Sequence, residues 1–173
     1  MLICLTGAPG IGKTTIIKKL VQYLKDSFVD VGGFFTEEVR NAEGYREGFD
    51  IVTVSNQRGI LARKSGIKSR LKVGAYSVDI GQFEGLALPS FNDPQRVMII
   101  DEVGKMELFS TSFKEAIENL LNSVDISIVA TLPLKSNDPF INHLKKESKM
   151  LIHVTQANRD NLLPKIIEQV HIK

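Results

Sequence analysis

Eight consecutive residues near the start of the chain match the pattern G-x-x-x-x-G-K-[ST] without a mismatch. They are Gly7, Ala8, Pro9, Gly10, Ile11, Gly12, Lys13 and Thr14. In such a loop the glycines let the backbone turn tightly, so that successive N–H groups point at one anion and cradle the α- and β-phosphates of a nucleotide. The lysine reaches the β- and γ-phosphates, and the threonine hydroxyl ligates Mg²⁺. The motif therefore predicts a site for a nucleoside polyphosphate with magnesium.

Two acidic residues, Asp101 and Glu102, directly follow the apolar run at residues 97–100. A carboxylate at the carboxyl end of a buried parallel strand lies where open α/β sheets bind their ligands. We predict that Asp101 completes the Mg²⁺ site together with Thr14. We predict that Glu102 is a general base that deprotonates a water for attack on the γ-phosphate. The catalytic residues are then Glu102 and Lys13, and the pattern favours hydrolysis over binding alone.

Further polar residues near this site each allow more than one interpretation. Lys105 could approach the phosphates or lie on the surface. Thr131 follows the apolar run at 126–130, where it could sense the γ-phosphate, hold the water or cap a turn. Between residues 57 and 72 there are six cations and no acid: Arg58, Arg63, Lys64, Lys68, Arg70 and Lys72. A solvated face is the favoured interpretation of this basic segment, ahead of a phosphate contact or a nucleic-acid contact.

The elements that would hold these residues alternate strand and helix at both ends of the chain. Strands are expected at residues 2–6, 97–100, 126–130 and 150–154, and helices after the loop, at 82–91, 113–121 and 158–170. Another helix is expected to start at Asp138, with Pro139 in its first position. Pro164 should kink the last helix or delay its start. This order predicts a three-layer α/β fold around a mostly parallel sheet.

The middle of the chain has a different pattern. Strand-like stretches at residues 31–39 and 49–54 flank a turn at 41–44, which predicts a hairpin. Shorter strands are expected at 60–62 and 75–78. We expect this antiparallel region to be inserted beside the parallel sheet, within a single domain of residues 1–173.

Composition limits the partners and the compartment. The net charge is +2, and no aromatic residue lies within the basic segment, so a nucleic-acid partner is not expected. No apolar run approaches the ~20 residues of a membrane span, and no signal peptide is visible. The one cysteine, Cys4, lies in the first expected strand and has no internal partner. These features favour a cytoplasmic protein, and they leave any protein partner unknown.

The chain resembles a family of small nucleoside-triphosphatases, known from thermophiles and, as the cancer-related nucleoside-triphosphatase, from animals. Four segments carry the resemblance: TGAPGIGKTT at residues 6–15; GFFTEEVR at 33–40 with GFDIV at 48–52; GAYSV at 74–78 with FE at 83–84 and ALP at 87–89; and IIDEVGKME at 99–107. The first segment is shared with many other proteins. The remaining three are typical of this family.

The resemblance implies slow, Mg²⁺-dependent hydrolysis of nucleoside triphosphates (ATP, GTP, CTP and UTP) to diphosphate and phosphate, with broad base tolerance. It implies a P-loop NTPase fold with an added strand between the strand of the loop and that of Asp101. It also implies nucleotide contacts at the loop and at a second stretch: Val97, Met98, Ile99, Ile100, Asp101, Glu102, Val103 and Gly104. Arg40 is a hypothetical phosphate contact.

Two other functions stay open at this point. A nucleotide or small-molecule kinase would share the phosphate loop and could use the basic segment as a lid, although a water-activating Glu102 would waste its ATP. An NTP-dependent switch would couple binding to a partner and use hydrolysis as a timer.

Overall fold

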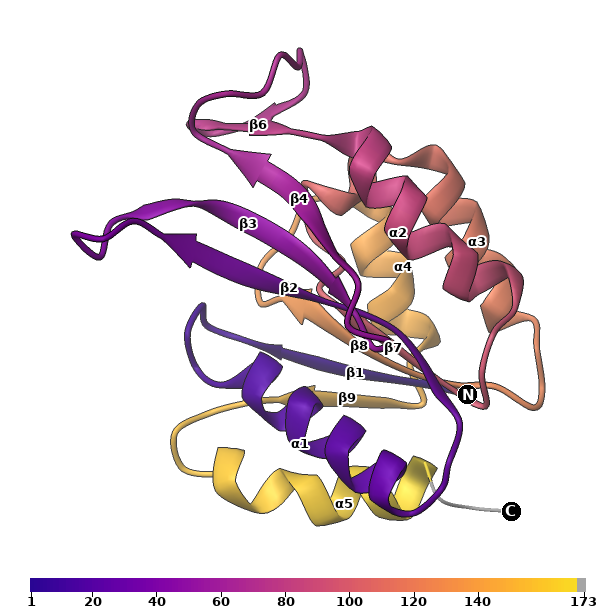
Figure 1. The fold of residues 1–173 in the computed structure, drawn as a ribbon. Helices are drawn as coiled ribbons and strands as arrows, with labels where there is room; N and C mark the ends of the chain where they lie inside the picture. The colour runs from indigo at the N-terminus through magenta and orange to yellow at the C-terminus, as the bar shows by residue number, and fades with distance from the viewer. Residues whose placement is uncertain (171–173) are drawn as a thin grey trace.

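The computed structural model describes residues 1–170, and one mixed sheet runs through this part of the chain. Its strand order is β5-β6-β4-β3-β2-β7-β8-β1-β9. The parallel strands are β2 (Val31–Arg40), β7 (Val97–Asp101), β8 (Ser127–Pro133), β1 (Leu2–Gly7) and β9 (Met150–His153). Figure 1 shows this sheet nearly edge-on, between two groups of helices.

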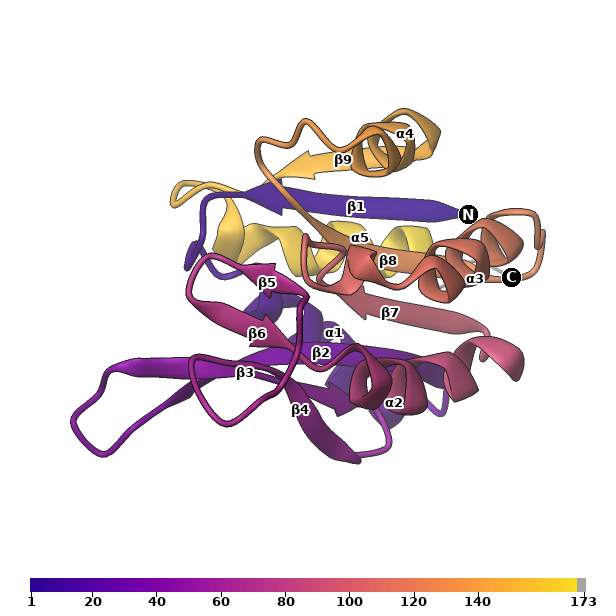
Figure 2. The same cartoon turned by 90° about the horizontal axis from the view of Figure 1, so that it is seen from above.

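The other strands are antiparallel: β3 (Arg46–Thr53), β4 (Arg58–Arg63), β6 (Tyr76–Val78) and β5 (Lys72–Val73). The described sheet has four parallel and four antiparallel pairings, so the expected mostly parallel sheet is wrong. The reason is the short turn after β2, since a chain that reverses within a few residues can only pair antiparallel. The hairpin extends the sheet instead of lying beside it, and its tip projects beyond the parallel strands (Figure 2).

Helices cover both faces of the sheet. α1 (Lys13–Asp26) and α5 (Leu162–Val170) lie on one face, while α2 (Ile80–Asn92), α3 (Thr111–Leu121) and α4 (Pro139–Glu147) lie on the other (Figures 1 and 2). The two layers enclose separate hydrophobic cores. Alternate residues of β7 enter each core, Ile99 beneath α1 and Met98 and Ile100 beneath α2 and α3. Because both faces of β7 are buried, this strand is apolar at every position before its last residue, Asp101.

Two helix starts follow local chemistry. Asp138 is the N-cap of α4, and its carboxylate accepts hydrogen bonds from the N–H groups of Phe140 and Ile141, with Pro139 in the first turn as expected. A short 3₁₀ turn (Arg159–Asn161) precedes α5, which leaves Pro164 in the first turn of that helix. Pro164 therefore delays the start of the α-helix, because a missing N–H costs no helical hydrogen bond there.

The topology brings the two predicted motifs to the same edge. β8 lies between β1 and β7, which is the added strand that the family resemblance implied. These three strands are parallel, so their carboxyl ends, at Gly7, Asp101 and Pro133, meet at one edge. Among residues 1–170, no helix has the length and apolar character needed to cross a membrane.

Candidate functional site

The phosphate loop joins β1 to α1. Gly10 and Gly12 have φ angles of 73° and 113°, in the left-handed region that favours glycine. Gly12 is the N-cap of α1, and no side chain caps this helix start. The first N–H groups of α1 therefore point toward the loop opening without a protein acceptor, as binding of a phosphate requires.

Lys13 fixes a positive charge within this loop. Its side chain is buried, and Nζ donates hydrogen bonds to the carbonyl oxygens of Gly7, at 3.1 Å, and Ala8, at 3.3 Å. The same ammonium lowers the pKa of Glu102, although burial of Glu102 is the larger effect and raises it. The loop thus encloses a cation that an incoming phosphate would meet.

Asp101 ends β7 and is 1% exposed. Its Oδ1 accepts a hydrogen bond of 2.5 Å from the Thr131 hydroxyl. Within the part of the chain that the structure describes, its other oxygen, Oδ2, is buried without a hydrogen-bond partner. Burial raises the pKa of Asp101, and the hydroxyls of Thr131 and Thr14 act in the opposite direction. A buried carboxyl group that interacts with the Thr14 hydroxyl and has one oxygen without a hydrogen-bond partner fits a hard divalent cation or its bound water.

Glu102 is half-buried and joined to Asp101 by a cis peptide bond. Burial raises the pKa of Glu102, Lys13 lowers it and the charge of Asp101 raises it again. The side chain lines a cavity of about 910 Å³ that it shares with the phosphate loop. A carboxyl with a raised pKa at the wall of such a cavity is typical of a general base.

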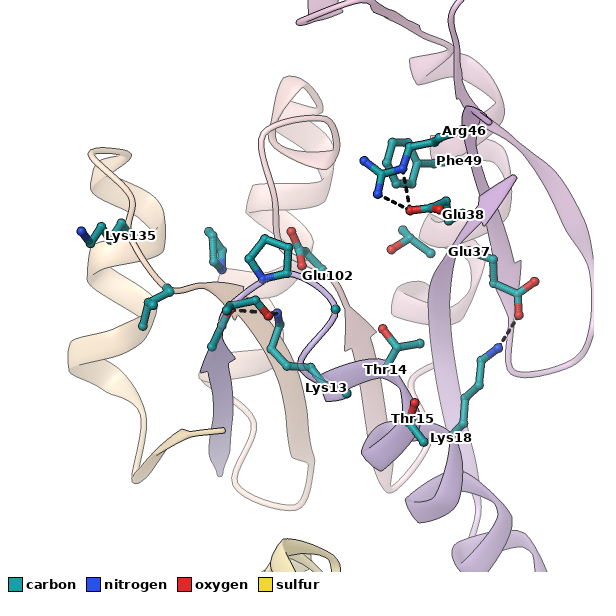
Figure 3. A pocket seen from close by; sticks show the side chains of 18 residues that line it. Lys13, Thr14, Thr15, Lys18, Glu37, Glu38, Arg46, Phe49, Glu102 and Lys135 are labelled. Carbon is teal, nitrogen blue, oxygen red and sulfur yellow. Dashed lines mark hydrogen bonds and ion pairs between the residues drawn. The ribbon is translucent and has the colours of Figure 1, made fainter. Parts of the chain in front are cut away.

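Three walls enclose this cavity (Figure 3). One is the loop with the first residues of α1, and another comprises Pro133, Leu134 and Lys135 after β8. The third comes from the hairpin: Thr36, Glu37, Glu38, Arg46 and Phe49. A second cavity, of about 320 Å³, adjoins the first and shares five lining residues with it: Thr36, Phe49, Glu102, Pro133 and Lys135.

Most of the residues predicted from the loop motif line the main cavity: Gly7, Ala8, Pro9, Gly10, Gly12, Lys13 and Thr14. Ile11 instead packs against the core beneath α1, and its carbonyl accepts a hydrogen bond from Arg159 at 3.3 Å.

The residues of the second stretch for which nucleotide contacts were implied, 97–104, lie partly at the cavities and partly in the core. Glu102 lines both cavities, and Gly104 lines the smaller one. Val97, Met98, Ile99, Ile100 and Val103 are fully buried and line neither cavity. Their side chains hold β7 and the following loop in place, because this central strand is packed on both faces. The structure gives no place for a nucleotide at these five side chains.

The structure also shows where Thr131, Lys105 and Arg40 lie. Thr131 holds the Asp101 carboxylate in place. Lys105 lines the smaller cavity. Arg40 contacts Glu38, donates to the Gly44 carbonyl at 2.7 Å and does not line the main cavity.

In the basic segment, Lys64, Lys68, Arg70 and Lys72 are exposed, and so is Arg58. Arg58 and Arg63 form ion pairs with Asp50, at 2.7 and 2.5 Å.

Sequence reasoning missed two features of the site. Glu107 is buried and accepts a hydrogen bond of 3.1 Å from the Gly104 N–H, which shapes the loop after Glu102. Burial raises the pKa of Glu107 to about 8. The cavity wall formed by Glu38, Arg46 and Phe49 was also missed. The available signal was the clustering of charges in a strand, Glu37, Glu38 and Arg40, which is unusual for a half-buried strand.

Comparisons with known proteins found a matching family and several similar proteins. The model of the family described as NTPase matches residues 2–167. The cancer-related nucleoside-triphosphatase homolog of Mus musculus is 42% identical over 180 residues, which cover 96% of this chain and 94% of that protein. The human cancer-related nucleoside-triphosphatase is 43% identical over 178 residues, with coverages of 94% and 93%.

A solved structure is also similar. The crystal structure of THEP1 from Aquifex aeolicus superimposes with a TM-score of 0.86 at 35% identity, over 99% of this chain and 100% of that one. The likeness therefore extends over the antiparallel strands as well as the phosphate loop. Because the family match and the relatives each span nearly all of its length, this chain belongs to the NTPase family.

Proposed function

We propose that the protein hydrolyses nucleoside 5′-triphosphates to nucleoside diphosphates and phosphate, with Mg²⁺ as its cofactor. The observation that carries this proposal is the position of Glu102, on the wall of the cavity that the phosphate loop enters. The names of the relatives, which are nucleoside-triphosphatases, support it. A carboxylate at this place serves hydrolysis, because binding alone needs no base beside the γ-phosphate.

Thr14 and Asp101 would hold the magnesium ion. The unpartnered Oδ2 of Asp101 fits a cation or one of its waters, and Thr131 keeps the carboxylate in a fixed orientation. When bound, the ion would neutralise charge on the β- and γ-phosphate oxygens.

The chain's own residues would divide the reaction among them. The N–H groups of the loop and the Lys13 ammonium hold the β- and γ-phosphates. Glu102 takes one proton from a water molecule as the water oxygen bonds to the γ-phosphorus. The bond from that phosphorus to the bridging oxygen breaks, and its electron pair stays with the nucleoside diphosphate. The buried Asp101 keeps its place throughout, since it cannot turn without losing Thr131.

Broad base tolerance is part of the proposal. The phosphate loop recognises phosphates and touches no base. Among the described residues that line the main cavity there is no asparagine or glutamine, the side chains that most often read a base edge by paired hydrogen bonds. We expect ATP, GTP, CTP and UTP to be hydrolysed at rates within about tenfold of one another, equivalent to ~1.4 kcal/mol.

The test is phosphate release from each of the four triphosphates with Mg²⁺ and no acceptor. Glu102→Gln should bind nucleotide like the wild type and be nearly inactive, because its amide cannot take the proton. Glu43→Gln removes an exposed carboxyl in the hairpin turn and should behave like the wild type. If the wild type binds nucleotide and releases no phosphate, the proposal is wrong.

The smaller cavity favours a kinase as the second candidate. A small molecule seated there would place its hydroxyl beside Glu102, in the position of the attacking water, with Lys105 and Met106 around it. The same experiment separates the two functions. Phosphate release at a steady rate without any acceptor supports hydrolysis, whereas nucleotide binding without release directs attention to this cavity.

A further inference from the structure

A network of ion pairs lies along the hairpin wall of the main cavity. Five cationic side chains meet three carboxylates there. Glu38 contacts Arg40 and Arg46, Glu37 contacts Lys18 and Arg58, and Asp50 contacts Arg58 and Arg63. Of the five cations, Lys18 and Arg46 line the cavity. Their partners Glu37 and Glu38 line it as well, so the network faces the cavity as two pairs of a cation and a carboxylate.

Arg40 and Arg46 form a natural comparison. They lie opposite each other in the β2–β3 hairpin, and both contact Glu38. Arg40 folds toward the hairpin turn, where it donates to the Gly44 carbonyl. Arg46 folds the other way, with its guanidinium carbon 5.5 Å from the centre of the Phe49 ring. Its Nε donates to Glu38 Oε2 at 2.5 Å. One arginine of the pair thus enters the cavity wall and the other does not.

The strand register places this wall next to the reacting end of a nucleotide. β2 pairs with β7, with Phe35 opposite Asp101, so the residues of β2 after Phe35 extend past the end of β7. Thr36 and Glu38 therefore line the cavity next to Glu102. Figure 3 shows Glu102 between Lys13 on one side and the Arg46–Glu38 pair on the other. A γ-phosphoryl group held by Lys13 and attacked from Glu102 would face Arg46.

We propose that Arg46 contacts the γ-phosphoryl group as it transfers and stabilises the negative charge that develops on its oxygens. This inference rests on the proposed hydrolysis and names a catalytic residue for it. A guanidinium stays charged at any working pH and offers two N–H groups to two oxygens at once. The Arg46 guanidinium carries five N–H groups, and its pairing with Glu38 uses only part of them, so it can contact the phosphoryl oxygens while it stays paired. The chain supplies this arginine itself, from the start of β3.

The test compares Arg46→Ala, Arg46→Lys and the matched control Arg40→Ala. Arg46→Ala should lower kcat by about 10²- to 10³-fold, the usual effect of losing one transition-state donor. The Kd for a non-hydrolysable ATP analogue should change by less than about threefold, since the contact forms in the transition state. Arg46→Lys should recover only a small part of the rate, because an ammonium cannot make two parallel hydrogen bonds. Arg40→Ala should stay within about threefold of the wild type.

Trapping with ADP, Mg²⁺ and aluminium fluoride gives a second readout, because this complex mimics the transferring phosphoryl group. Wild type and Arg40→Ala should form the stable complex, and Arg46→Ala should not. The inference is overturned if Arg46→Ala keeps the wild-type kcat, or if Arg40→Ala loses as much rate as Arg46→Ala. A wild type that binds ATP and releases no phosphate overturns the proposed hydrolysis instead, so the two failures are distinct.

Discussion

The Thr131 hydroxyl donates a hydrogen bond of 2.5 Å to Asp101 Oδ1, and both side chains are buried where β8 and β7 end. Of the two carboxylate oxygens, one is thereby fixed, and the other is buried without a hydrogen-bond partner among the described residues. The predicted metal ligand is thus oriented by a neighbouring strand, as buried ligating carboxylates generally are.

Replacing this hydroxyl should weaken magnesium binding. Thr131→Val leaves the Asp101 oxygen without its donor, and the pKa of Asp101 should rise further because the Thr131 hydrogen bond now lowers it. We expect a loss of ~1–3 kcal/mol in the free energy of unfolding and a higher Mg²⁺ concentration for half-maximal phosphate release. Urea denaturation and a Mg²⁺ titration measure the two effects.

Thr131→Ser is the matched control, because it keeps the hydroxyl and loses one methyl group. Its Mg²⁺ midpoint should stay within about twofold of the wild type, or ~0.4 kcal/mol. Equal midpoints for Thr131→Val and the wild type would show that the hydrogen bond does not orient the ligand.

The rate should fall as the pH is lowered through the titration of Glu102. Burial raises the pKa of Glu102 above its usual value of 4.5, and a base acts only in its deprotonated form. The expected profile of kcat therefore has an acid limb whose midpoint lies above 4.5. Steady-state phosphate release at saturating MgATP, from pH 4.5 to 9, measures it, while nucleotide binding is followed over the same range to separate affinity from turnover.

The residual activity of Glu102→Gln provides the control for this profile. Its acid limb should disappear, because the amide does not titrate. An acid limb of unchanged position in this variant would assign the titration to another group, with Asp101 the first to consider, since burial also raises its pKa.

Local patterns were sufficient for the phosphate loop, the end of β7 and the hairpin. Each of these is set by nearby residues: three glycines, an apolar run before Asp101, and a turn between two alternating stretches. The extent of the antiparallel half was not predictable in the same way. β5 and β6 have two and three residues, too few for any period to show, and they form only because β4 offers its edge.

The direction in which long side chains point could also not be predicted from the sequence. Arg40 and Arg46 are the same residue type, pair with each other across the β2–β3 hairpin, and both contact Glu38. Arg46 packs over the Phe49 ring, whereas Arg40 donates to the Gly44 carbonyl in the hairpin turn. Likewise, the resemblance implied nucleotide contacts across Val97–Gly104 as a block, whereas burial separates Glu102 and Gly104 from the core residues. These outcomes depend on packing between strands that are distant in sequence.

Gly33 should tolerate no side chain, because β2 approaches β7 closely there. A Cβ atom at Gly33 would lie 1.9 Å from the carbonyl oxygen of Ile99, and the φ angle is already 101°. We expect Gly33→Ala to lower the free energy of unfolding by at least ~3 kcal/mol, by overpacking added to backbone strain. It should also lower the rate, since β2 carries the wall with Glu38.

Gly44→Ala separates strain from overpacking. Gly44 has a φ angle of 85° in the hairpin turn, and no atom lies within 4 Å of the place of a Cβ. Its cost should be the left-handed backbone alone, about 1–2 kcal/mol. Urea denaturation of both variants gives the difference, and similar losses would mean that the approach of β2 to β7 is not what excludes a side chain at Gly33.

Glu107 should make the protein less stable as the pH rises. Burial raises its pKa from 4.5 to about 8, with the charge of Glu102 acting in the same direction. Between these values the folded protein keeps a proton that the unfolded chain has lost. The contribution of Glu107 to the free energy of unfolding is therefore fully present below pH 4.5 and decreases toward pH 8. The decrease is at most ~1.4 kcal/mol per pH unit.

Glu107→Gln should remove this dependence, because a glutamine amide does not titrate and its oxygen can still accept the hydrogen bond from the Gly104 N–H. Urea denaturation at pH 5, 6, 7 and 8 should show the variant gaining on the wild type as the pH rises. Glu43→Gln, which changes an exposed carboxyl, should run parallel to the wild type. A constant difference between Glu107→Gln and the wild type over this range would mean that Glu107 is ionised in the folded protein, with its charge held by the Gly104 amide.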